Sequence, residues 1–295
     1  MASVPATIEQ LVDLLDLERL EEDLYRGTHP EGSTLTRVFG GQVAAQALMA
    51  ASRSVPEDRP VHSLHVYFLL GGDPSVPIIY DVERIRDGGS FSTRRVSARQ
   101  HGKVIFYMTA SFHRIEDGFE HQNAMPEVPP VDASPALSEV LGYVDERAAA
   151  HWRKEWSALD VRYVGDNRDA DDPARTLMPA IQRLWLRAGG ELPADPVLNA
   201  CVLTYISDLT LLGSSLVPHG LTIGSPRIQP ASLDHAMWFH RPVRADHWML
   251  YDQASPSAIG ARGFTTANIF AEDGSLVASV AQEGLIRPVK PRPQA

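Results

Sequence analysis

Two copies of one stretch decide the fold: SLHVYFL at residues 63–69 and SLDHAMWF at residues 232–239. Further landmarks follow each copy at nearly constant spacing, 171 positions for Phe68/Phe239 and Tyr80/Tyr251 and 172 positions for Gly102/Gly274. A repeat of this length indicates duplication of a whole domain and not a solenoid of short units. The chain is therefore expected to contain two similar halves that meet at a seam, where one site can be built from both.

The first half reads as one helix followed by an antiparallel sheet. An Ala-rich run at residues 43–51, almost free of charge and opened by two glycines, predicts a helix that is buried on most sides. Strand patterns with β-branched and aromatic residues follow at residues 63–69, 78–86, 91–100 and 103–114. His101-Gly102 predicts a tight hairpin turn between the last two strands, because Gly accepts positive φ without a steric penalty.

The second half repeats this order. An alternating strand at residues 183–187 precedes an apolar helix at 196–212, and four strands follow between Ser232 and Arg287. The predicted fold class is α+β, in which each half has a long central helix wrapped by a curved antiparallel sheet. This is the hotdog arrangement, and two tandem repeats make a double hotdog.

Three regions are expected along the chain. Residues 1–118 form the N-terminal hotdog repeat, 119–178 a connector with a Pro-rich start, and 179–295 the C-terminal hotdog repeat, which carries the unusual polar residues. The connector is predicted to cross the surface without forming a third domain.

Composition excludes several classes of protein. A net charge of −10 over 295 residues argues against a nucleic-acid partner, because phosphate binding needs clustered Lys and Arg. The one cysteine, Cys201, has apolar neighbours and is expected to be a buried structural thiol in a cytoplasmic, reducing environment. No run reaches the ~18 apolar residues of a membrane span, and acidic residues interrupt the N-terminus where a signal peptide would be apolar.

The common motifs for cofactor chemistry are missing. The sequence has no P-loop, no dinucleotide-binding fingerprint, no Gly-x-Ser-x-Gly elbow and no Cys/His cluster with zinc spacing. No cofactor and no metal ligand is therefore predicted. The chemistry is sought instead in polar residues placed inside apolar elements.

Three such residues stand in the second half. Asp208 lies in the apolar helix region, where an unpaired carboxylate is costly to bury. Gln282 occupies the position at which the first repeat has Ala110, so the two copies differ in role there. Ser232 opens the first core strand of this repeat with a hydroxyl that can both donate and accept.

Each of the three also has a structural interpretation. Asp208 can be a helix cap or one half of an ion pair, Gln282 a sheet residue bonded to backbone, and Ser232 a local hydrogen-bond partner at a strand start. Asp234 and His235 follow directly, but adjacent strand residues point to opposite faces and cannot easily serve one site. Structural roles are therefore expected for both.

These stretches, taken in order, resemble the acyl-CoA thioesterase II family of double-hotdog enzymes. The resemblance covers nearly the whole chain and rests on VFGGQV at 38–43, VHSLH at 61–65, PIIYDV at 77–82, FYMTASF at 106–112, GFEHQ at 118–122, SDL at 207–209, DHAMWFHRP at 234–242 and VAQEG at 280–284. In that family the catalytic group is an Asp, a Ser or Thr, and a Gln from the second hotdog. The resemblance places them at Asp208, Ser232 and Gln282.

The resemblance implies hydrolysis of fatty acyl-CoA to free acid and CoA by a water that these three residues hold, with no acyl-enzyme. Gly40, Gly41 and Gln42 are candidates to present backbone N–H groups to the thioester oxygen. The remaining candidates for substrate binding carry positive or titratable groups, and are His62, Arg94, Arg95 and Arg262.

Two other functions remain open from the residues. One is a hotdog enoyl-CoA hydratase or dehydratase, which needs a Gly-Asp-x-Asn-Pro-x-His type of loop that this chain lacks. The other is a non-catalytic acyl-CoA-binding protein. A homodimer or homotetramer is expected, because hotdog sheets commonly cover their edges by joining between subunits.

Overall fold

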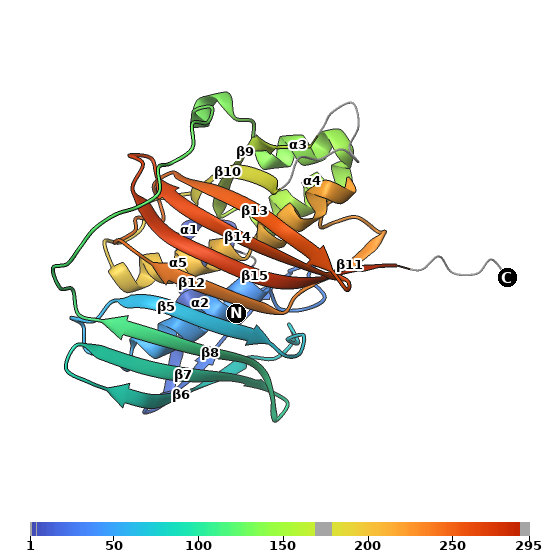
Figure 1. Cartoon of the computed structure of the whole chain (residues 1–295). Coiled ribbons are helices and arrows are strands. Elements are labelled where there is room, and N and C mark those ends of the chain that lie inside the picture. Colours follow the sequence, from blue (N-terminus) through green and yellow to red (C-terminus); the bar gives the residue numbers. More distant parts are fainter. Residues whose placement is uncertain (1, 4, 169–178, 290–295) are drawn as a thin grey trace.

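Two helix-and-sheet units follow one another along the chain in the computed structural model, which describes residues 2–3, 5–168 and 179–289 (Figure 1). The first unit contains β1 (Ala2–Ser3), α1 (Ile8–Leu15), β2 (Glu18–Glu21), β3 (Leu24–Gly27), β4 (Pro30–Glu31), α2 (Gly40–Ser52), β5 (Val61–Phe68), β6 (Ile78–Asp87), β7 (Phe91–Gln100) and β8 (Lys103–His113). The ends of β5, β6, β7 and β8 lie within two residues of the ends predicted for the four strands.

A crossing segment and the second unit complete the chain. The crossing segment carries the 3-10 helix η1 (Val131–Ala133), α3 (Leu137–Val144) and α4 (Glu146–Glu155). The second unit contains β9 (Leu159–Asp166), β10 (Ala180–Ala188), α5 (Pro196–Ser207), the 3-10 helix η2 (Leu211–His219), β11 (Ile228–Ser232), β12 (Asp234–Phe239), β13 (Met249–Ile259), β14 (Arg262–Ala271) and β15 (Leu276–Pro288).

One continuous antiparallel sheet joins the two units. Its strand order is β2-β3-β6-β7-β8-β5-β12-β15-β14-β13-β10-β9, with β11 also paired to β15. Each half of this order contains the equivalent strands of one repeat, arranged from the edge to the centre in the same sequence. The equivalent strands β5 and β12 lie next to each other in the middle. The predicted double hotdog is therefore confirmed, and the seam between the repeats is a pair of hydrogen-bonded strands.

The seam also contains the axis that relates the two halves. In the β5–β12 pair His65 lies opposite Ala236. These two positions differ by the same 171 residues that separate the repeated landmarks, so each is the counterpart of the other. The approximate twofold axis therefore passes through this pair.

The two central helices lie together on one face of the sheet, behind the strands in Figure 1. Every residue of α2 from Gly41 to Ala51 is buried, as is every residue of α5 from Leu198 to Ser207. At the start of α2 the backbones come very close, since a Cβ on Gly41 would stand 2.5 Å from the backbone oxygen of Tyr205. A side chain at this position would separate the helices.

The predicted helix at 196–212 is shorter than expected. It begins at Pro196, with the Asp195 side chain accepting from the N–H groups of Val197 and Leu198, and it ends at Ser207. Asp208 is the C-cap residue, and the chain then continues into η2, whose C-cap residue Gly220 has a φ of 61°. Asp208 therefore lies at a break in the helix and not inside it.

Three further predictions are refined by the structure. Ser232 ends β11 and does not open a core strand, because Leu233 separates β11 from β12. β9 lies within the predicted connector yet pairs with β10, so the end of that segment belongs to the sheet. His101 and Gly102 both have positive φ, as the predicted tight turn requires, whereas only Gly274 does in the matching turn.

One stretch is long and apolar enough to cross a membrane by length and composition, although the sequence analysis found none. It runs from Pro196 to His219, joining α5 and η2, and 78% of its most apolar window is buried inside the fold. Burial against α2 and the sheet identifies it as the core helix of the second repeat.

Substitution of Gly41 tests the close contact between the helices. We expect Gly41→Ala to lower the free energy of unfolding by about 1–3 kcal/mol, because overpacking against backbone cannot be relieved by a rotamer change. Gly118→Ala is the control, since a Cβ there meets no atom within 4 Å. Urea unfolding of both variants checks this, and equal stability of Gly41→Ala and the parent chain would contradict it.

Candidate functional site

Asp208 lies where the two repeats meet. It follows the last turn of α5 in the second repeat, and its carboxylate faces the first turn of α2 in the first repeat. A Cβ on Gly40 would stand 2.7 Å from Asp208 Oδ2 and 2.8 Å from the Phe68 ring, so a side chain there would collide with both. The site is thus built from both halves of the chain, as the duplication suggested.

The three predicted catalytic side chains are in mutual contact. Gln282 Nε2 donates to Asp208 Oδ1 at 2.6 Å and contacts Ser232 Oγ at 2.9 Å. The Ser232 hydroxyl lies 3.3 Å from the same carboxylate oxygen. Strands β11 and β15 carry Ser232 and Gln282, and their pairing holds both beside the end of α5.

The carboxylate is strongly desolvated. Only 4% of the Asp208 side chain is exposed, and this burial raises its pKa from 3.8 to about 6. Hydrogen bonds from Gln282, Ser232 and the Gly41 backbone N–H act in the opposite direction. The C-terminal end of α5 also disfavours a negative charge, whereas the N-terminal end of α2 favours one. The result is a carboxyl group that can exchange a proton near neutral pH.

The start of α2 depends on this carboxylate for its cap. Phe39 is the N-cap residue, and its side chain cannot accept a hydrogen bond from the first turn. The Gly41 N–H instead bonds to Asp208 from the other repeat. The predicted role of Gly40 and Gly41 near the reacting group is therefore compatible with the structure, although both glycines are also required by packing.

His235 lies beside the carboxylate, which the sequence analysis did not anticipate. Its ring is 1% exposed, with Nε2 2.9 Å from Ser207 Oγ and Nδ1 4.0 Å from Asp208 Oδ1. Burial lowers its pKa to about 3, so the ring is neutral at pH 7. Strand alternation indicated that only one of Asp234 and His235 faces inward; the pairing of His235 with Val66 of β5 selects His235.

Two buried polar atoms near Asp208 have no hydrogen-bond partner among the described residues. They are His235 Nδ1 and Gln282 Oε1, both on side chains that are 1% exposed. Buried groups of this kind are usually bonded to water where protein offers no partner. These two atoms therefore retain hydrogen-bonding capacity for a water or a polar substrate atom.

The matching end of the first repeat has no such site. Its helix C-cap is Arg53, and Ala110 takes the place of Gln282. Arg94, which pairs with Ala110 as Thr265 pairs with Gln282, fills the position with its guanidinium. Of the two related helix ends, the end of α5 carries the buried carboxylate, and the end of α2 does not.

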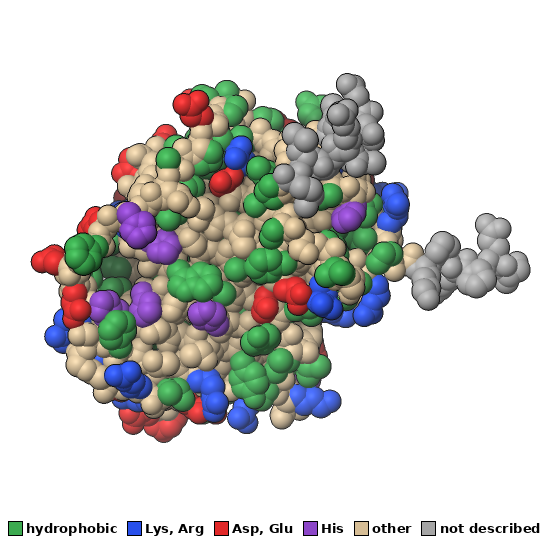
Figure 2. Space-filling model, in the orientation of Figure 1, with side chains coloured by type: hydrophobic (Ala, Val, Ile, Leu, Met, Phe, Trp, Pro, Cys, Tyr) green, Lys and Arg blue, Asp and Glu red, His purple; other side chains and the backbone are tan. Residues whose placement is uncertain are grey.

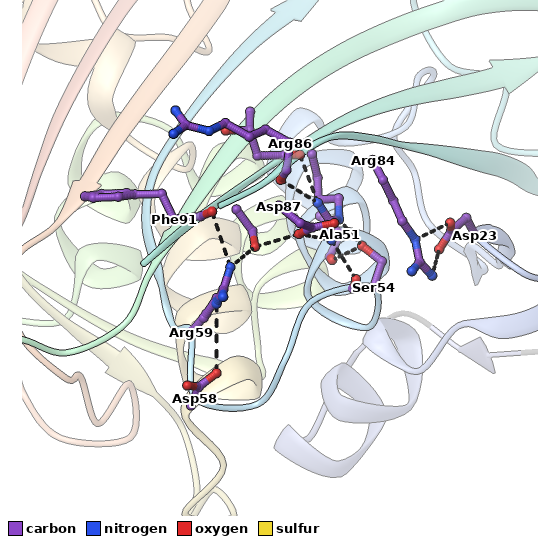
Figure 3. A network of polar contacts seen from close by, with 12 residues as sticks. Asp23, Ala51, Ser54, Asp58, Arg59, Arg84, Arg86, Asp87 and Phe91 are labelled. Atoms are coloured by element: carbon purple, nitrogen blue, oxygen red, sulfur yellow. Dashed lines mark hydrogen bonds and ion pairs between the residues drawn. The ribbon is translucent and has the colours of Figure 1, made fainter. Parts of the chain in front are cut away.

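Arg94 is a structural residue and not a contact for substrate phosphate, which corrects the sequence prediction. It is 1% exposed, and its guanidinium donates to Ser54 Oγ at 2.8 Å, to the Ser54 carbonyl at 2.9 Å and to Asp87 at 2.9 Å. Figure 3 shows the surrounding network, in which Arg59 also reaches the Phe91 carbonyl. These bonds close the end of α2 against β6 and β7.

The other cationic candidates are exposed and paired. Arg95 binds Glu83 with contacts of 2.6 and 3.0 Å, and Arg262 binds Glu283 at 2.8 Å. Arg262 lies nearer to Asp208 along the sheet than Arg95 does, because its partner Glu283 directly follows Gln282 in β15.

His62 and Gln42 do not reach the carboxylate. His62 bonds Ser111 at 2.8 Å and lies six residues from Phe68, or about 20 Å along β5 from the end that contacts Gly40. The Gln42 side chain donates to the Thr28 carbonyl at 3.0 Å and is 3% exposed. The prediction of a substrate contact by His62 does not fit this position, whereas the backbone N–H of Gln42, in the first turn of α2, stays a predicted contact.

A pocket adjoins the start of α2 on the side of the crossing segment. It is a shallow, partly open pocket that is lined in part by Phe39, Gln42, Trp156 and Tyr205. Glu155 closes its wall by accepting from Ser33 and Thr34. Among the described residues no group of three or more His, Cys, Asp or Glu side chains could hold a metal ion.

Comparison with known proteins gives consistent matches to both repeats. The profile of the family described as Acyl-CoA thioesterase matches residues 171–285, and that of the Acyl-CoA thioesterase N-terminal domain matches residues 28–113. Acyl-coenzyme A thioesterase 8 of Mus musculus is 44% identical over 292 residues, covering 96% of this chain and 90% of that protein. Acyl-CoA thioesterase 2 of Haemophilus influenzae is 40% identical over 283 residues, with 95% and 98% covered.

Solved structures agree. The crystal structure of acyl-CoA thioesterase II TesB2 from Mycobacterium marinum is 47% identical, covers 94% of this chain and 98% of its own, and superposes with a TM-score of 0.79. A protein of unknown function with a hot dog fold from Alicyclobacillus acidocaldarius, 20% identical, covers 94% of this chain and 98% of its own with a TM-score of 0.76, which supports the fold alone.

The raised pKa of Asp208 predicts an unusual pH dependence of stability. Between about pH 4 and 6 the folded chain binds more protons at Asp208 than the unfolded chain, so stability falls as pH rises through this window. We expect Asp208→Asn to be more stable than the parent chain by about 1–3 kcal/mol at pH 8, and the difference to vanish near pH 4.

Denaturant unfolding at the two pH values checks the prediction for Asp208, with the exposed Asp117→Asn as control. A loss of stability of Asp208→Asn at pH 8 would contradict the assignment of a strained, desolvated carboxylate.

Arg94 is buried and its neighbour Arg95 is exposed, so substituting each in turn tests whether Arg94 has a structural role. We expect Arg94→Met to lower the free energy of unfolding by about 2–4 kcal/mol, because Ser54 and Asp87 lose a buried partner. Arg95→Met should cost at most about 1 kcal/mol, since its ion pair is exposed. Thermal melting measures both, and a raised KM of Arg94→Met without loss of stability would restore a role in substrate binding.

Proposed function

The chain belongs to the acyl-CoA thioesterase family and hydrolyses acyl-CoA to a free acid and CoA; from this premise we propose that Asp208, Ser232 and Gln282 hold the water that attacks the thioester carbonyl. The observation that carries the proposal is their mutual contact at one buried carboxylate, within 2.6–3.3 Å. The three arise from separate elements, which no local hydrogen-bonding requirement brings together.

Asp208 acts as the general base. Its carboxylate accepts a proton as the water oxygen bonds to the thioester carbon, and a pKa of about 6 lets it do so near neutral pH. The C–S bond then breaks, the electron pair stays on sulfur, and the protonated carboxyl returns its proton to the CoA thiolate, which is the stronger base. Ser232 and Gln282 hold the water and carboxylate in one orientation, which lowers the entropic part of the barrier.

The thioester oxygen is proposed to lie at the start of α2. The first N–H groups of a helix have no intrahelical acceptor, and the helix dipole favours negative charge at this end. Gly40 leaves the backbone uncovered beside Asp208. Donors placed where negative charge develops are among the largest contributions to acyl-transfer catalysis.

The substrate is proposed to be a fatty acyl-CoA. The relatives named above are acyl-CoA thioesterases, and neither hydration of a double bond nor binding without turnover is favoured by these similarities. Arg262, exposed beside the strand that carries Gln282, is the better placed of the predicted phosphate contacts.

We propose that the protein acts in the cytoplasm as a homodimer or homotetramer. Cys201 is a free, fully buried thiol, and burial raises its pKa, which suits a reducing compartment. Hydrophobic and His side chains stand among uncharged surface near the centre of the face shown in Figure 2. Tyr67 and Trp238 are 61% and 38% exposed, which supports an interface between copies. Light scattering of the purified protein tests the assembly.

Thiol release from a panel of acyl-CoAs of increasing chain length tests the catalytic assignment. We expect Asp208→Asn to lower kcat/KM by about 10²–10⁴-fold, because the variant keeps the size of the side chain and loses the base. The wild type should show a pH profile that rises with an apparent pKa near 6, and the variant should lack this limb.

Asp273→Asn, on an exposed hairpin, serves as the matched control and should retain wild-type activity. Equal activity of Asp208→Asn and the wild type would show that Asp208 is structural. Absence of thiol release by the wild type on every substrate would contradict the hydrolase assignment.

A further inference from the structure

We propose that His235 is a fourth catalytic residue, whose Nδ1 accepts a hydrogen bond from one O–H of the attacking water while Asp208 accepts the proton of the other. The inference rests on the proposed function and extends it, since the same water is held. It is carried by the position of the ring, by its hydrogen bonds and by the two unpartnered atoms at the site.

The strands place His235 next to Gln282. Ala236 of β12 pairs with Ala281 of β15, so the next residue along each strand, His235 and Gln282, lie side by side. Both are buried on the inner face of the sheet, below the end of α5. His235 thus approaches Asp208 from the sheet, whereas Gly40 approaches it from α2.

Ser207 determines which nitrogen of the ring carries the proton. Its Oγ lies 2.9 Å from the Thr204 carbonyl, which can only accept, and 2.9 Å from His235 Nε2. A hydroxyl has one proton, so donation to Thr204 leaves Oγ as acceptor of Nε2–H. Its other contact, Met237 Sδ at 3.2 Å, is a weak acceptor. In the neutral ring Nδ1 then carries the lone pair.

Nδ1 lies 4.0 Å from Asp208 Oδ1, which also accepts from Gln282, and among the described residues no donor bonds to Nδ1. Two acceptors at this separation repel one another unless a donor lies between them. A water at about 2.8 Å from each satisfies both with its two protons. Its oxygen lone pairs then point away from both acceptors, toward the side on which a thioester carbon can be attacked.

The chemistry balances with the water alone. One proton moves to Asp208 as the O–C bond forms, and the second remains hydrogen-bonded to Nδ1 of a ring that stays neutral. Asp208, from the end of α5, is the titratable group beside the ring, and Tyr251 donates its hydroxyl proton to the Ser207 carbonyl at 2.7 Å. The strand opposite contributes Val66.

Two substitutions separate this role from a structural one. In His235→Asn the side-chain amide can place a polar atom near the position of Nδ1, but the link to Ser207 is lost. In His235→Gln a polar atom can reach the position of Nε2 and keep that link, but Nδ1 is lost. The proposal expects kcat to fall about 10- to 100-fold in His235→Gln and clearly less in His235→Asn, with KM nearly unchanged in both.

The opposite order, with His235→Gln near wild type and His235→Asn impaired, would overturn the proposal, because it is what an anchor between α5 and the sheet predicts. His240→Gln is the matched control, since His240 Nε2 bonds Ser279 Oγ at 2.9 Å outside the site. Circular dichroism and melting establish that each variant is folded.

Ser207→Ala tests the same idea if the His235 variants do not fold. Loss of the hydroxyl frees the ring to adopt both tautomers, so kcat should fall about 3- to 10-fold with KM unchanged; an unchanged kcat would overturn the proposal. Asp208→Asn is assayed in parallel. Full activity of that variant would show that the water site itself is wrong, whereas its inactivity beside a fully active His235→Gln would reject His235 alone.

Discussion

The whole arrangement depends on one close contact between the start of α2 and the end of α5. The helices can approach this closely only because Gly41 has no side chain in front of the Tyr205 carbonyl. The approach in turn brings the Asp208 carboxylate to the uncapped first turn of α2, where it is held out of water. A carboxyl group with a raised pKa is therefore a product of helix packing before any substrate is bound.

The C-terminal ends of the two central helices are equivalent in the duplicated fold, but they have different polar partners. At one end a helix terminus meets a carboxylate, an amide and a hydroxyl, which leave buried hydrogen-bonding capacity unused. At the other end Arg94 reaches the corresponding helix terminus and uses its donors on Ser54 and Asp87. At the first end the buried carboxylate is electrostatically unfavourable, whereas at the second end the hydrogen bonds of Arg94 are expected to stabilise the fold.

Much of this could be predicted from the sequence because the repeat supplied an internal comparison. The matched spacing identified equivalent strands, and the difference between Ala110 and Gln282 drew attention to a side chain that the structure brings into contact with Asp208. Three features could not be predicted. The helix break at Asp208 depends on packing against α2, the burial of Arg94 depends on which strand face turns inward, and the inward side of the pair Asp234 and His235 depends on pairing with β5. Each is a tertiary effect that local periodicity does not contain.

The axis through His65 and Ala236 has a consequence for how such a site can change. In an assembly of two identical hotdog subunits, every substitution would appear at both ends at once, and Arg94 could not occupy one end while Thr265 and Gln282 occupy the other. Joining the two copies in one chain removes this coupling. The end at Arg94 can then be filled with hydrogen bonds that stabilise the fold, while the end at Asp208 contains a buried charge. An entirely symmetric molecule would have to stabilise that charge at both ends.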